Sequence, residues 1–132
     1  EDTLSLHDAL PICYDLRFPE LFRAMGEVDL IVLPAAFTYT TGRAHWEVLV
    51  RARAIENECY VIAPNQVGKK PRFTAYGHSL IVDPRGKVLA EADGTETGVI
   101  YAPIDLDLVS KVRKETFTLQ NRREDIYSLC LK

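Results

Sequence analysis

Residues 29–34 read DLIVLP and residues 59–64 read CYVIAP, two apolar runs that each close at a proline. Continuous β-branched and leucine runs of this length are typical of buried strands. Between them, residues 43–57 contain no proline or glycine and carry strong helix formers. The apolar face of this helix is expected to consist of Val48, Leu49, Ala52 and Ile55. Strand, helix and strand in this order predict a parallel βαβ crossover.

The second half of the chain predicts antiparallel pairing. Residues 77–83 are expected to form a strand that ends in the turn sequence DPRG, and residues 87–91 to form the returning strand of a hairpin. Residues 99–104 predict a further strand, and Asp105 is placed to cap a helix that runs to about Glu115. The sequence therefore predicts an α/β fold with a mixed sheet.

Composition excludes some classes of partner and cofactor. The chain has 132 residues and a formal net charge of -3, which disfavours nucleic acid and anionic membrane as partners. No apolar run has the roughly 18 residues of a membrane helix. The three cysteines, Cys13, Cys59 and Cys130, are too few and too widely spaced for a disulfide framework or a zinc site. They predict reduced thiols in the cytoplasm, with Cys59 in the core. We expect no metal and no cofactor.

The segment ICYDLRFPE, residues 12–20, holds the candidate nucleophile, Cys13. A short helix is expected after Phe18, because Pro19 suits a first helical turn and Gly26 suits a C-terminal cap. A sharp turn at Cys13 is needed to expose its sulfur. A cysteine attacks as the thiolate, and it needs a cationic neighbour to ionise at neutral pH.

Four motifs in order resemble the nitrilase superfamily of carbon–nitrogen hydrolases: ICYDLRFPE; DLIVLP; HWE with RARAIEN; and GHS with VDPRG. The resemblance covers residues 12–127. It implies the C-terminal half of an αββα sandwich with a mixed sheet, and a Glu–Lys–Cys catalytic triad. Phe37, Thr41-Gly42 and His45-Trp46 look most like the branch of deaminated-glutathione amidases and omega-amidases.

The resemblance implies a role for several residues. Cys13 would form a thioester with an amide carbonyl, and the backbone amide of Tyr14 would stabilise the oxyanion. Arg17 would meet a substrate carboxylate, which a planar guanidinium suits; the alternative is an exposed pair with Glu20. Phe37 and Thr41 are candidate pocket residues, or ordinary loop packing. Glu47 is a candidate supporting carboxylate near the site, with Arg51 and Glu56 as scaffold charges.

Two histidines leave another reading open. His45 and His78 could form a papain-like Cys–His pair with Cys13. Because the family uses lysine and glutamate instead, we expect both histidines to be hydrogen-bonding scaffold residues.

The family's catalytic glutamate and lysine lie upstream of the nucleophile motif, where this chain has only twelve residues. Its first lysine is Lys69. Residues 3–12 match the translation of a common sequencing adapter, and Pro11 interrupts the strand expected there. We therefore expect residues 1–12 to be a foreign leader and residues 13–132 to be the C-terminal part of a carbon–nitrogen hydrolase domain. Expressed alone, the chain is expected to be inactive and prone to aggregate.

Three functions are considered. The parent protein is expected to be an amidase that acts on a small carboxylated amide. It is also expected to form homo-oligomers. The alternative is an inactive fragment or a non-catalytic binding module without the triad glutamate and lysine. A nitrilase acting on nitriles is disfavoured by Arg17 and Thr41, since a nitrile needs no carboxylate contact.

Overall fold

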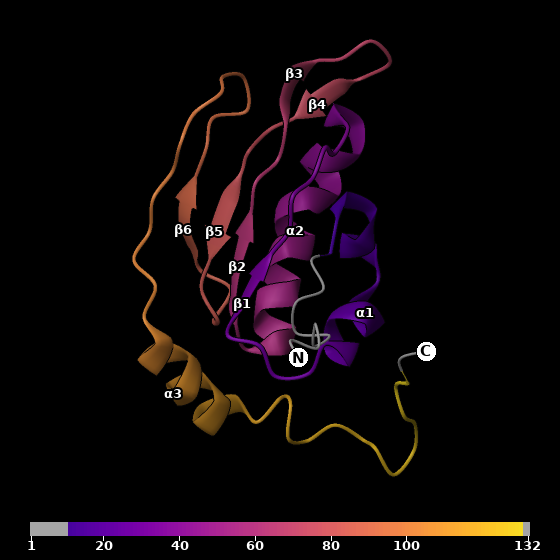
Figure 1. The fold of residues 1–132 in the computed structure, drawn as a ribbon, viewed down its shortest axis with the longest axis vertical. Helices are drawn as coiled ribbons and strands as arrows, with labels where there is room; N and C mark the ends of the chain where they lie inside the picture. The colour runs from indigo at the N-terminus through magenta and orange to yellow at the C-terminus, as the bar shows by residue number, and fades with distance from the viewer. Residues whose placement is uncertain (1–10, 131–132) are drawn as a thin grey trace, which may run out of the picture.

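The structure is a computed structural model that describes residues 11–130. Its main sheet has four strands in the order β1-β2-β5-β6. The strands are β1 (Leu30–Val32), β2 (Tyr60–Ala63), β5 (Leu80–Val82) and β6 (Val88–Glu91). β1 and β2 are parallel, whereas β2 with β5 and β5 with β6 are antiparallel. The mixed sheet, the βαβ crossover and the hairpin of β5 and β6 are thus confirmed (Figure 1).

Helix α2 (Tyr39–Asn57) connects β1 to β2 and packs on one face of the sheet. It begins four residues before the predicted start at Arg43 and includes Gly42. A Cβ at Gly42 would lie 2.4 Å from Cβ of Tyr76. Glycine is therefore needed there because the first turn of α2 packs directly on the neighbouring strand.

The predicted apolar face of α2 was wrong in part. Val48 and Ile55 are 66% and 48% exposed. The buried face consists of Gly42, Trp46, Val50, Arg53, Ala54 and Asn57. The two polar members keep hydrogen bonds inside the protein: Arg53 donates to Leu16 O, and Asn57 Nδ2 donates to Arg53 O, while Asn57 Oδ1 has no hydrogen-bond partner within residues 11–130.

Two short helices precede β1. They are the 3-10 helix η2 (Cys13–Arg17) and α1 (Pro19–Ala24), with Pro19 in the first turn as predicted. Gly26 follows with φ +76°, a conformation that suits glycine. A two-stranded hairpin, β3 (Val67–Lys69) and β4 (Thr74–Tyr76), was not predicted. It projects beyond the main sheet at the end opposite α3 (Figure 1).

The strand predicted at residues 99–104 is absent: these residues have no regular structure. Their β-branched and aromatic side chains are instead open to solvent, with Val99 74% and Tyr101 84% exposed. The segment is held at its end, where the Tyr60 hydroxyl donates to Asp105 O and accepts from Asp105 N. Helix α3 (Leu106–Thr116) then begins as predicted, with the Asp105 carboxylate accepting from Asp107 N at 2.9 Å.

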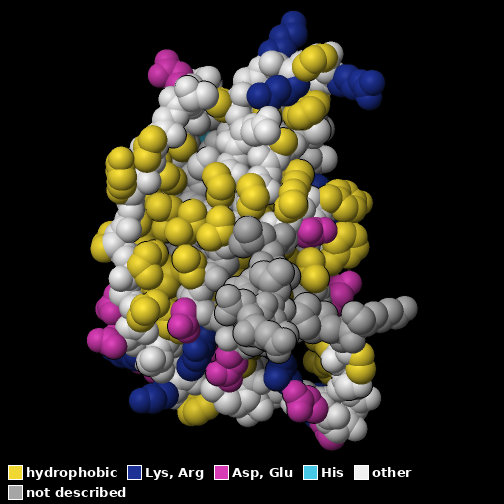
Figure 2. Space-filling view, in the orientation of Figure 1, with side chains coloured by type: hydrophobic (Ala, Val, Ile, Leu, Met, Phe, Trp, Pro, Cys, Tyr) yellow, Lys and Arg dark blue, Asp and Glu magenta, His cyan; other side chains and the backbone are white. Residues whose placement is uncertain are grey.

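The core lies between the sheet and the helices α1 and α2, and it includes Phe22, Ile31, Trp46 and Val61. The other face of the sheet carries exposed apolar side chains, among them Leu30. Figure 2 shows hydrophobic side chains gathered across this side of the molecule. No helix within residues 11–130 is long and apolar enough to cross a bilayer. Most of the leader expected at residues 1–12 lies outside the described residues.

Candidate active site

Cys13 lies in a sharp turn between residue 12 and the helix η2. Its φ is +43°, a left-handed conformation that is unfavourable for a residue with a side chain. Hydrogen bonds on both sides hold the turn. Cys13 N donates to Pro34 O at 3.0 Å, and Ile12 N donates to the Asp15 carboxylate at 2.9 Å. The expected sharp turn is thus present. Its strained backbone is held by the hydrogen bond to Pro34, which follows β1.

The backbone amide of Tyr14 lies at the start of η2. The first hydrogen bond of this turn runs from Asp15 N to Ile12 O. Amides ahead of the first such bond have no intrahelical acceptor. The Tyr14 amide therefore directly follows Cys13 in the chain as a donor without an acceptor in its own helix, while its side chain is 66% exposed.

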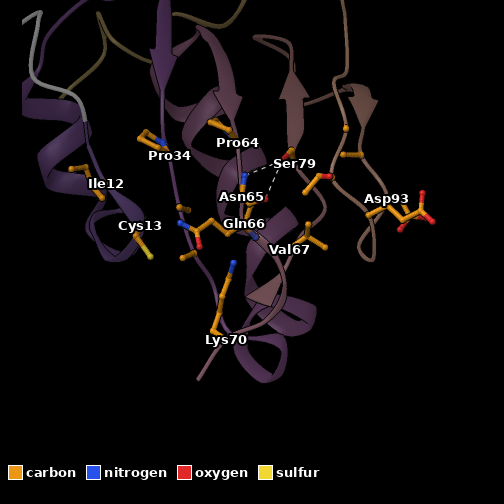
Figure 3. Close-up of a pocket in the computed structure, with 16 residues that line it drawn as sticks. Ile12, Cys13, Pro34, Pro64, Asn65, Gln66, Val67, Lys70, Ser79 and Asp93 are labelled. Atoms are coloured by element: carbon orange, nitrogen blue, oxygen red, sulfur yellow. Dashed lines mark hydrogen bonds between the residues drawn. The ribbon is translucent and has the colours of Figure 1, made fainter. Parts of the chain in front are cut away.

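Cys13 lines an open cavity of about 570 Å³ at the carboxyl ends of β1 and β2 (Figure 3). The cavity lies where ligands bind in open α/β sheets, outside the carboxyl ends of the strands. Its walls come from the Cys13 turn, from segments after β1, β2 and β6, from β3 with the residue that follows it, and from Ser79 before β5. They are Ile12, Cys13, Pro34, Ala35, Ala36, Pro64, Asn65, Gln66, Val67, Lys70, Ser79, Ala92, Asp93, Glu96, Thr97 and Gly98. Tyr14, Arg17, Phe37 and Thr41 are not in this lining.

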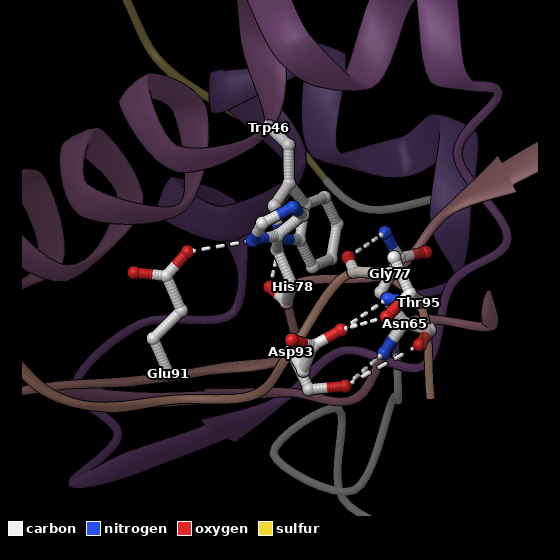
Figure 4. A network of polar contacts seen from close by, with 8 residues as sticks. Trp46, Asn65, Gly77, His78, Glu91, Asp93 and Thr95 are labelled. Atoms are coloured by element: carbon white, nitrogen blue, oxygen red, sulfur yellow. Dashed lines mark hydrogen bonds and ion pairs between the residues drawn. The ribbon is translucent and has the colours of Figure 1, made fainter. Parts of the chain in front are cut away.

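Asn65 organises the walls of the cavity and was missed in the sequence. Its Oδ1 accepts from Phe37 N at 3.0 Å and its Nδ2 donates to Gly77 O at 2.7 Å. Its backbone N donates to Ser79 Oγ at 2.9 Å. Asn65 thereby joins the segments around Phe37 and around Gly77 and Ser79, and Figure 4 shows it beside Gly77. A polar residue directly after a buried strand, here after Pro64, was the signal that could have identified it.

Arg17, four residues after Cys13, lies between two aromatic rings. Its guanidinium carbon is 5.6 Å from the centre of the Tyr14 ring and 5.2 Å from that of Phe37. Its Nη1 lies 3.2 Å from Nδ1 of His45. Phe37 is buried and packs on Trp46 with ring centres 4.9 Å apart. Arg17 and Phe37 are thus brought together, and Ala36, next to Phe37, lines the cavity.

The remaining predicted residues lie at the edges of this arrangement. Thr41, in the first turn of α2, shares a 2.9 Å hydrogen bond with the Thr38 hydroxyl. Glu47 is exposed and pairs with Arg51 at 3.3 Å, while Arg51 Nε donates to Gly86 O. Within residues 11–130, no hydrogen bond links Glu47 to Cys13 or Arg17. Arg51 thus ties α2 to the turn before β6, and Glu47 pairs with Arg51.

The two histidines hold the scaffold and do not contact the thiol. His78 has φ +55°, its carbonyl accepts from Trp46 Nε1 at 2.7 Å, and its Nδ1 lies 2.8 Å from Glu91 Oε1 (Figure 4). Neither His78 nor His45 shares a hydrogen bond with Cys13 in the part of the chain that the structure describes. The arrangement does not support a papain-like pair.

Arg53 fixes the far end of the nucleophile turn. It is buried, and both Nε and Nη2 donate to Leu16 O, at 3.1 and 2.8 Å. Its Nη1 pairs with Glu56 at 2.9 Å, and its guanidinium lies over the Phe22 ring. A guanidinium presents several donors in a rigid plane, so one side chain can hold both the η2 carbonyl and α1.

The other described cysteines differ from Cys13. Cys59 is buried, and burial raises its pKa from 9.0 to about 12, with Arg113 opposing and Asp29 adding to the rise. It is a core residue, as predicted. Cys130 is exposed. It lines a separate cavity beside α1, whereas Cys13 lines the cavity at the carboxyl ends of β1 and β2.

The fold and this site define an α/β protein that presents a cysteine at the carboxyl end of its sheet. The family model described as "Carbon-nitrogen hydrolase" matches residues 9–114, and the chain belongs to this family. It is 49% identical over 116 residues to a deaminated glutathione amidase of Synechocystis sp., which covers 86% of this chain and 42% of that protein. The predicted family is confirmed.

Solved structures agree with the fold. The crystal structure of the Caenorhabditis elegans NitFhit protein superposes with a TM-score of 0.83 at 45% identity, over 94% of this chain and 31% of that one. A variant of the amidase from Nesterenkonia sp. AN1 carries the acetamide moiety of fluoroacetamide on its active-site cysteine; it has a TM-score of 0.69 at 30% identity, over 89% of this chain and 41% of its own. The chain therefore spans less than half the length of these relatives.

Proposed function

We propose that the full-length protein carrying this chain is an amidase that hydrolyses small carboxylated amides through a thioester on Cys13. One observation carries the proposal: a left-handed turn directs Cys13 into the cavity at the carboxyl ends of β1 and β2. A strained backbone persists only where its surroundings hold it, and such strain clusters at active sites.

The chemistry proceeds in two steps. The Cys13 thiolate forms a bond to the amide carbon, and the C–N bond breaks as the leaving amine takes a proton. Water then attacks the thioester carbon, releasing the acid and restoring the thiol. The Tyr14 amide donates to the oxyanion in each step. The glutamate that moves the protons and the lysine that supports the oxyanion would come from the part of the protein upstream of Cys13.

We also propose that Arg17 selects substrates with a carboxylate, with Phe37 and Thr41 beside it. Within residues 11–130, Arg17 has no carboxylate partner, so its charge is available to an anion. Glu47 supports α2 through Arg51. Deaminated glutathione, which the name of the Synechocystis relative indicates, carries such a group, and so do the omega-amides of 2-oxo acids.

The alternative is that this sequence acts without catalysis, as a fragment or binding module. The upstream sequence separates the two: an amidase requires an in-frame glutamate and lysine there. We further propose a cytoplasmic protein, supported by three free cysteines. We propose homo-oligomers too, supported by Val48 and Ile55, which are exposed on α2.

The test uses a full-length fusion in which the upstream part of the Synechocystis amidase precedes residue 13. Acid product is measured by mass spectrometry for an omega-amide of a 2-oxo acid, deaminated glutathione and an uncharged amide of similar size. We expect hydrolysis of a carboxylated amide and its loss in Cys13→Ala. Equal turnover by Cys13→Ala, or a preference for the uncharged amide, would show the proposal to be wrong.

A further inference from the structure

The contact between Arg17 and His45 has a fixed direction. A guanidinium can only donate hydrogen bonds, so at 3.2 Å the His45 Nδ1 must be the acceptor. An imidazole nitrogen accepts only when it carries no proton, so this hydrogen bond requires the neutral form of His45 with its proton on Nε2. A doubly protonated ring would place two cations in contact.

His45 therefore orients Arg17 without neutralising it. A carboxylate at the same place would make an ion pair and reduce the attraction of Arg17 for a second anion. The Tyr14 and Phe37 rings also hold the guanidinium by their faces without cancelling its charge. All three contacts of Arg17 in the described residues are thus uncharged, which leaves a held and unneutralised cation.

Two partners of Arg17, His45 and Phe37, are connected to buried residues of the core. His45 precedes Trp46, which is fully buried and donates to His78 O. Phe37 packs on Trp46, and its backbone N donates to Asn65. The position of the guanidinium is consequently set by residues that belong to the same packed unit as the wall of the cavity.

From this geometry we propose that His45 is a positioning residue that sets the preference for carboxylated substrates, by holding Arg17 with a neutral acceptor. The proposal rests on the proposed role of Arg17 as the carboxylate contact.

The test compares three variants at one exposed position in the full-length fusion. His45→Asn keeps a neutral acceptor near the place of Nδ1, His45→Asp keeps the acceptor but adds charge, and His45→Leu removes it. For the carboxylated amide, we expect KM to change by less than about twofold in His45→Asn, to rise about fivefold in His45→Leu and to rise about tenfold or more in His45→Asp. The kcat values and the KM for the uncharged amide should remain close to those of the parent.

A second measurement needs no catalysis. Trp46 is the single tryptophan of the 132 residues and packs on Phe37. Its fluorescence can therefore report glutarate binding to the full-length fusion, in which any tryptophan of the upstream part is replaced by phenylalanine. Glutarate should shift the emission of the parent and of His45→Asn at similar concentrations and that of His45→Asp only at higher ones; glutardiamide is the uncharged control.

Equal effects of His45→Asn and His45→Asp, or equal effects on charged and uncharged amides, would overturn the role of His45. Arg17→Met separates this failure from failure of the proposed function. If Arg17→Met abolishes the preference for the carboxylated amide while the three His45 variants have equal KM values for it, only the role of His45 is wrong. If Arg17→Met also leaves the preference unchanged, the proposed carboxylate contact is wrong as well.

Discussion

Cys13 and Cys59 lie near opposite ends of the parallel strands β1 and β2, and each lies at or beside a left-handed residue. Cys13 itself has φ +43°, whereas next to Cys59 it is Glu58 that has φ +50°. At the carboxyl end of the strands the strained residue opens onto a cavity. At the amino end it is fully buried, with the Glu58 carboxyl accepting from the Thr116 hydroxyl and from Thr118 N.

The difference shows two uses of one backbone conformation. At Glu58 the unusual φ directs a side chain inward, where it ties β2 to the end of α3. At Cys13 it directs a side chain outward, while backbone hydrogen bonds and Arg53 hold the turn from behind. Strain therefore indicates a reactive site only where the strained side chain reaches solvent-accessible space.

The largest expected effect tests which cysteine reacts. In the full-length fusion, Cys13→Ala should lower kcat for the carboxylated amide by at least about a thousandfold, because the thioester cannot form. Cys59→Ala is the matched control and should keep kcat within about threefold, since its thiol faces the core. Comparable losses of kcat in both variants would show that the two cysteines do not differ in their role in catalysis.

The amino end should respond in stability instead of activity. Glu58→Ala removes the acceptor for two part-buried hydrogen bonds and should lower the free energy of unfolding by about 2 kcal/mol. Glu58→Gln keeps a neutral acceptor and should cost about 1 kcal/mol. Urea denaturation of the full-length fusion measures both; a Glu58→Ala variant as stable as the parent would show that the carboxyl does not hold α3.

The buried thiol should also weaken the fold at alkaline pH. The pKa of Cys59 is about 12 in the folded state and near 9.0 when exposed, so between these values the unfolded state binds fewer protons and stability falls as pH rises. The loss is about 1.4 kcal/mol per pH unit. The stability difference between parent and Cys59→Ala should therefore shrink by about 2 kcal/mol from pH 9 to pH 10.5 in urea denaturation. A constant difference would contradict the assigned burial.

The smallest effect concerns the support of the nucleophile turn. Arg53→Lys cannot present two donors to Leu16 O, so we expect kcat/KM to fall about tenfold. Arg51→Lys, on the same helix and also bonded to a carbonyl, is the control and should change kcat/KM by less than about threefold. The same loss in both would indicate a general effect on α2.

The sequence predicted those parts of the fold that local patterns determine. The runs at residues 29–34 and 59–64, the cap at Asp105 and the motif around Cys13 all carry their signal within a few residues. The buried face of α2 was misread because Arg53 and Asn57 look like surface residues, and only their partners, Leu16 O and Arg53 O, explain their burial.

Other features depend on partners that no local pattern supplies. Residues 99–104 have strand-like composition, but a strand forms only where a neighbouring edge accepts it. The sequence predicted which residues accompany Cys13 in the site, and the structure adds the contacts between them. The role of Asn65 follows from three segments that meet only in the folded chain, and the pairing of Arg17 with His45 spans 28 residues.

Part of the cavity wall extends the hydrogen bonds of the sheet, as Ala35 and Asn65 do. Another part, Lys70, Asp93 and residues 96–98, lies outside the pairing of β1, β2, β5 and β6. Substitutions in this second part can change the shape and charge of the cavity at little cost to strand register. The sheet and the Cys13 turn can thus be inherited unchanged while this part of the wall diverges. In evolutionary terms, the preference for a substrate can change while the reaction at Cys13 is kept.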